Sequence, residues 1–152
     1  KGGSSSARFA RRPDLLQKLR AVVGPRIKFL HVIRNPFDNI GSMVRRGMNL
    51  SIAVEQYFSR ADAVLDLSRR LDQRDLFSVS LEELIARPSD VIRDVCAFLE
   101  LDPIPDYIDA CGRVVNTQPH KTRTETEWTQ DLLRVVRERV SANPFLRHYT
   151  FD

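Results

Sequence analysis

Hydrophobic positions along this chain follow two different periods, which predict helices alternating with short strands. Apolar residues three and four positions apart predict helices at residues 14–23, 51–72, 81–86, 88–99 and about 130–142. A further helix is expected to begin after Asn35, which can cap it, with Pro36 in its first turn. Apolar runs without a helical period predict strands at residues 28–33 and 76–80. The first strand is apolar on both faces, which is typical of a strand buried within a parallel sheet.

This order of elements predicts an α/β protein with a parallel sheet. A chain of 152 residues fits one domain with a substantial core. Only two strands are evident, which is few for a complete sheet of this class. We therefore expect the chain to be part of a larger architecture.

Composition narrows the choice of partners. The 24 Lys and Arg exceed the 20 Asp and Glu, giving a net charge of +4, but the two signs are interleaved. A small polyanionic ligand fits this pattern better than a nucleic acid, which would favour a basic run. The two cysteines and three histidines lack ligand spacing, so no metal site is predicted. No membrane-spanning run and no signal peptide are visible, so a cytoplasmic location is expected.

A candidate anion site lies where the first strand ends. Arg34 closes the strand, the Asn-Pro turn follows, and Ser42 comes eight residues after Arg34. Open α/β sheets bind ligands at such strand ends. Ser42 lies roughly 10 Å along the helix from its cap, so a shared anion would sit on the flank of the helix and not at its tip. The alternative is structural: an Arg34–Asp38 pair and a Ser42 packed in the helix.

This run resembles the 3′-phosphate-binding signature of the sulfotransferases that use 3′-phosphoadenosine 5′-phosphosulfate. Arg34, Asn35, Pro36, Asp38 and Ser42 match that signature position by position. The resemblance implies that Arg34 and Ser42 bind the 3′-phosphate of the nucleotide, while Asp38 serves the helix cap. It also implies a three-layer parallel-sheet fold of the P-loop NTPase type, with residues 1–152 forming the helix-rich C-terminal portion of a single domain.

A second stretch of the resemblance is the polar loop at residues 116–127. The sequence HKTRTETEW is similar to the C-terminal phosphate-binding loop of the family, with Lys121 and Arg123 as the matching cations. Trp128 could stack on a base or anchor the following helix to the core. The opening KGGSSS is similar to a Gly-rich segment of some bacterial members, which would bring Lys1 and Gly2–Gly3 to the site.

Other features depart from the family. The P-loop-like motif that binds the 5′-phosphosulfate has no match in this chain, and no residue stands out as the catalytic base. The resemblance still implies transfer of a sulfuryl group to a hydroxyl or amine acceptor, on a small molecule, carbohydrate or lipid, leaving 3′-phosphoadenosine 5′-phosphate. Two alternatives remain: a P-loop-type nucleotide or metabolite kinase relative, and a non-catalytic anion-binding helical module.

Overall fold

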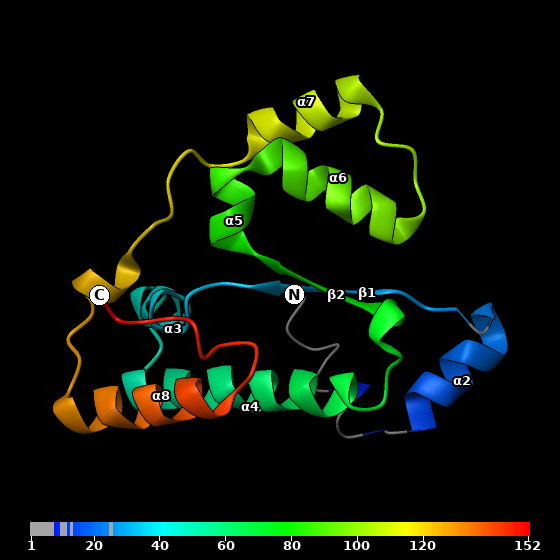
Figure 1. The fold of residues 1–152 in the computed structure, drawn as a ribbon. Helices are drawn as coiled ribbons and strands as arrows, with labels where there is room; N and C mark the ends of the chain where they lie inside the picture. The colour runs from blue at the N-terminus through cyan, green and yellow to red at the C-terminus, as the bar shows by residue number, and fades with distance from the viewer. Residues whose placement is uncertain (1–7, 10–11, 13, 25) are drawn as a thin grey trace. The chain divides into compact units, whose positions relative to one another are not determined.

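The structure is a computed structural model that describes residues 8–9, 12, 14–24 and 26–152. The described residues form two compact units, and each unit draws on separate stretches of the chain (Figure 1). The first unit contains residues up to Ile27 together with Asn35–Asp72 and Lys121–Asp152. The second contains Lys28–Arg34 and Gln73–His120.

The first unit is helical. Its elements are α2 (Asp14–Val23), α3 (Pro36–Arg45), α4 (Leu50–Ser68), the short 3₁₀ helix η2 (Thr122–Glu125) and α8 (Gln130–Ala142). Helix α3 packs against α4, η2 and α8, and α4 also packs against α8. The fully buried side chains at these contacts include Phe37, Ile40, Phe58 and Val136. This core therefore packs α3 against the helix that follows it and against elements from the C-terminal part of the chain.

The second unit is built on a parallel pair of strands. Strand β1 (Phe29–Ile33) pairs with β2 (Leu76–Ser80) in a register that runs from Phe29↔Leu76 to Ile33↔Ser80. The 3₁₀ turn η1 (Gln73–Asp75) precedes β2. Three helices follow β2: α5 (Leu81–Ala86), α6 (Pro88–Leu99) and α7 (Pro105–Val114). Helix α6 packs on β2, where the rings of Phe77 and Phe98 stack at 5.3 Å. The parallel register places the carboxyl end of β1 beside that of β2, since Ile33 pairs with Ser80.

The predicted class is confirmed as mixed α/β, with many helices and a small parallel sheet. Three points differ from the expectations. The helix predicted over 51–72 ends at Ser68, and α7 was not predicted because its few apolar residues lie among polar ones. Strand β1 is also not buried on both faces: Leu30 and Val32 are 42% and 64% exposed, because the sheet among the described residues has two strands.

Among the described residues, no helix combines the length and the apolar character that a transmembrane span needs.

Candidate functional site

The candidate site is organised around the start of α3, which Asn35 caps. The side-chain oxygen of Asn35 accepts hydrogen bonds from the backbone N–H groups of Phe37, at 3.0 Å, and Asp38, at 3.4 Å. Its amide nitrogen donates to the carbonyl of Thr150 at 3.0 Å, which ties the C-terminal tail to the same turn. Pro36 occupies the first turn, where its missing N–H costs nothing. The Asn-Pro turn therefore caps and begins α3, as the sequence predicts.

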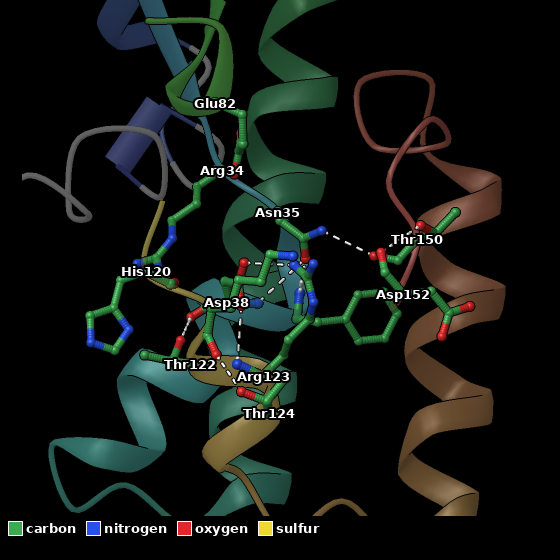
Figure 2. Close-up of polar contacts among 12 residues, drawn as sticks. Arg34, Asn35, Asp38, Glu82, His120, Thr122, Arg123, Thr124, Thr150 and Asp152 are labelled. Carbon is green, nitrogen blue, oxygen red and sulfur yellow. Dashed lines mark hydrogen bonds and ion pairs between the residues drawn. The ribbon is translucent and has the colours of Figure 1, made fainter. Parts of the chain in front are cut away.

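Asp38 connects α3 to η2. Its carboxylate accepts the backbone N–H of Arg123 at 3.0 Å and the guanidinium of Arg123 at 2.7 Å (Figure 2). The side chains of Asp38 and Arg123 are only 2% and 8% exposed. In addition, the hydroxyl of Thr122 donates to the backbone carbonyl of Asp38. One residue of α3 thus holds two successive residues of a loop more than 80 positions away in the chain.

Gly41 allows η2 to lie this close. A Cβ atom at position 41 would be 2.8 Å from the backbone oxygen of Thr122 and 2.8 Å from the hydroxyl oxygen of Thr126. Real Cβ atoms essentially never approach other heavy atoms so closely, so any larger residue would displace the loop. The glycine is needed here for close approach of two backbones and not for its backbone angles.

Trp128 fastens the other end of this loop. Its indole N–H donates to the carbonyl of Arg123 at 3.0 Å. Its ring packs edge to face with Phe37 and Phe151, at centroid distances of 5.8 and 6.1 Å. Of the two roles considered for Trp128, these contacts correspond to anchoring against the core.

The four predicted binding residues occupy different settings. Ser42, Lys121 and Arg123 lie in the first unit, and Arg34 lies in the second. Ser42 is 8% exposed, and within the described part of the chain its hydroxyl has no hydrogen-bond partner. Lys121 is exposed at the start of η2, whereas Arg123 is buried on Asp38. The guanidinium of Arg34 donates to the backbone carbonyl of His120, just before Lys121 (Figure 2).

The contacts of Asp38 differ from both sequence-based interpretations. Among the described residues, Asn35 provides the side-chain cap of α3, and the carboxylate of Asp38 pairs with Arg123 and not with Arg34. Sequence reasoning missed this pair because the two residues are 85 positions apart and no local spacing relates them. The signal that was available is the loop itself, because Arg123 was already one of its two candidate cations.

Three other observations concern a histidine of the sheet, metal binding and the start of the chain. His31 lies in β1, with its Nδ1 atom 3.3 Å from the hydroxyl oxygen of Ser78, and burial lowers its pKa below the ordinary value of 6.5. Among the described residues, no group of three or more His, Cys, Asp or Glu is arranged to hold a metal ion. Lys1 and Gly2–Gly3 lie outside the described residues.

Comparisons with known proteins agree with this architecture. A sequence model of the sulfotransferase family matches residues 9–106, which is more than half of the chain. The chain therefore belongs to the sulfotransferase family. The matched range contains Arg34 and Ser42 but ends before the loop with Lys121 and Arg123.

Solved structures with a similar fold include two sulfotransferases. A sulfotransferase domain from the curacin biosynthetic pathway is 21% identical, with a TM-score of 0.54 over 64% of this chain and 38% of that chain. A sulfotransferase from Alicyclobacillus acidocaldarius is 20% identical, with a TM-score of 0.52 over 94% of this chain and 63% of that chain. The chain thus spans 38% and 63% of the length of these two structures. The search of curated proteins found no match.

Proposed function

We propose that this chain is the nucleotide-binding portion of an enzyme that transfers a sulfuryl group from 3′-phosphoadenosine 5′-phosphosulfate to a hydroxyl or amine acceptor. The observation that supports it is the position of the run from Arg34 to Ser42, which joins the end of a parallel strand to a capped helix. In this proposal β1 and β2 belong to the parallel sheet of a three-layer fold of the P-loop NTPase type, within a single domain that includes residues 1–152.

The side chains of the run fit the 3′-phosphate of this nucleotide. The hydroxyl of Ser42 has no partner among the described residues and can donate to a phosphate oxygen. A guanidinium has five N–H donors, and the bond from Arg34 to His120 uses one of them. Arginine binds phosphate through paired, charge-assisted hydrogen bonds. Arg34 and Ser42 are therefore the proposed ligands of the 3′-phosphate.

The loop at η2 supplies further positive charge. Lys121 is exposed and can approach a phosphate, whereas the guanidinium of Arg123 is buried on the carboxylate of Asp38. We assign Lys121 to direct charge stabilisation around the phosphates, and Arg123 to the same site as a residue of its buried wall. When bound, the nucleotide supplies the sulfuryl group. The chain's own residues hold the nucleotide in place, which is the main contribution in this kind of transfer.

Thermal unfolding of the full-length protein tests the proposal. Adenosine 3′,5′-bisphosphate, ADP and AMP are titrated at fixed salt, because a ligand that binds the folded state raises its stability by about 2.7 kcal/mol at 100 times its dissociation constant. The bisphosphate is expected to stabilise selectively. That response should be lost in Arg34→Ala and reduced in Ser42→Ala.

The matched control for Arg34→Ala is Arg113→Ala. Arg113 also donates from its guanidinium to a backbone carbonyl, that of Asp109, at 3.3 Å, but it lies on α7. It should leave the response to the bisphosphate unchanged. Equal stabilisation by ADP and the bisphosphate would favour the kinase alternative, and no response to any of the three nucleotides would refute nucleotide binding altogether.

A further inference from the structure

We propose that Asp38 is a positioning residue of the nucleotide site. Through Arg123 and Thr122 it holds η2 against α3, and so it fixes Lys121 beside the helix to which Ser42 belongs. This inference rests on the proposed function, since Lys121 and Ser42 are phosphate-binding candidates there. It assigns Asp38, the one acidic residue of the signature run, a role that does not require contact with the nucleotide.

Three contacts concentrate on Asp38. Its two carboxylate oxygens accept from the backbone and from the guanidinium of Arg123, and its carbonyl accepts from the hydroxyl of Thr122 (Figure 2). A buried ion pair fixes geometry through directed hydrogen bonds, which an apolar contact of the same size does not. Because the contacts involve both backbone and side chain, they define where the start of η2 lies along α3.

Lys121 depends on this anchor for its position. It precedes Thr122 directly, and residues 115–121 form neither helix nor strand. Residues 116–121 are also exposed, so few packing contacts restrict them. On the other side, Arg34 donates to the carbonyl of His120. Within the first unit, the backbone that directly follows Lys121 is therefore held by Asp38.

Because Arg123 is buried on Asp38, two roles can be told apart by neutralising Asp38: positioning of the loop by Asp38, and direct binding of phosphate by Arg123. If Arg123 contacted the nucleotide, neutralising Asp38 would release its guanidinium and would leave binding unchanged or make it tighter. If Asp38 positions the loop, the same change weakens binding. Asp38→Asn thus gives opposite results under the two roles.

Gly41 offers a second perturbation that changes no charge. Alanine at this position would place a Cβ atom 2.8 Å from the backbone oxygen of Thr122, so η2 must move away from α3. Alanine also favours the helix more than glycine does. The matched control is Gly112→Ala in α7, because a Cβ there would have no neighbour within 4 Å.

The experiment measures binding of adenosine 3′,5′-bisphosphate to the full-length protein by calorimetry. We expect Gly41→Ala and Asp38→Asn to weaken binding about tenfold each, which corresponds to about 1.4 kcal/mol. Gly112→Ala should bind like the wild type, and so should Asp90→Asn, which neutralises an exposed aspartate that pairs with Arg93. Circular dichroism checks that each variant is folded. Thr122→Val, which removes only the hydroxyl contact to Asp38, replaces either variant if it does not fold.

Two further readouts distinguish positioning from general loss of structure. Trp128 is the single tryptophan and bonds to the carbonyl of Arg123, so its fluorescence should shift in Gly41→Ala. Lys121→Ala is expected to weaken binding about tenfold alone, but less than about threefold in the Gly41→Ala background. A purely structural role of the contact would leave the effect of Lys121→Ala the same in both backgrounds.

The outcomes separate the inference from the proposed function. Wild-type protein that does not bind the bisphosphate overturns both. Wild-type binding together with unchanged binding in the folded Gly41→Ala and Asp38→Asn variants overturns the positioning role alone. Tighter binding in Asp38→Asn would also overturn it, and would show that Arg123 binds the nucleotide directly.

Discussion

Removing the guanidinium of Arg123 should destabilise the protein far more than removing an arginine from a surface ion pair. Arg123→Met keeps most of the side-chain volume but leaves the carboxylate of Asp38, 2% exposed, without its counter-charge. Breaking a buried pair on one side costs about 3–5 kcal/mol. The backbone N–H of Arg123 still donates to Asp38 at 3.0 Å, so we expect the lower end, about 3 kcal/mol.

Chemical denaturation measures this cost. For a chain of 152 residues, 3 kcal/mol corresponds to a decrease in the urea midpoint of roughly 1–3 M. It also corresponds to a decrease in the melting temperature of roughly 6–12 °C. The double variant Asp38→Asn/Arg123→Met should be more stable than Arg123→Met, because it no longer buries an unpaired charge.

The matched control is Arg93→Met, at an exposed pair with Asp90 whose side chains are 55% and 60% exposed. Exposed pairs of this kind contribute about 0–1 kcal/mol and are screened by salt. The reasoning is refuted if Arg123→Met costs as little as Arg93→Met. It is equally refuted if the effects of Asp38→Asn and Arg123→Met simply add.

Two further predictions concern the start of α3 and the first strand. Asn35→Ala should cost more than about 1 kcal/mol in denaturation, and more than Asn49→Ala, since both cap helices but Asn35 also donates to Thr150; equal costs would contradict a contribution from the Thr150 bond. Because burial lowers the pKa of His31, the unfolded state binds more protons, so stability should decrease as the pH falls through 6.5. His31→Gln should lack that component in pH-dependent melting, and an unchanged profile would contradict the assignment.

Local chemistry made the elements of this fold predictable. The bounds of α2, β2, α5 and α6 agree with the ranges expected from hydrophobic period and from Pro and Gly positions. Helix α3 was predictable because an Asn cap followed by Pro is a signal that acts within one turn. Helix α7 gave a weaker signal: Pro105 lies in its first turn, as a proline does in α3 and α6, but only Ile108 of the helix is buried, so its apolar pattern is poor.

Strand β1 shows a different limit of sequence reasoning. Its apolar residues correctly predicted a strand, but the exposure of Leu30 and Val32 depends on what pairs with and covers β1. The apolar pattern of these five residues indicates that the strand can be buried. It does not indicate which other segments are present to bury it.

For the candidate site, the sequence by itself was enough to identify the run from Arg34 to Ser42 as a strand end followed by a capped helix. It was enough because strand, cap and helix spacing are properties of neighbouring residues, and because the run matches a family signature. Only the tertiary structure decided the partner of Asp38, the need for glycine at position 41 and the burial of Arg123. These depend on the packing of η2 against α3, which joins residues more than 80 positions apart. Closing such a loop is favoured by the sum of many contacts, and no local spacing encodes that sum.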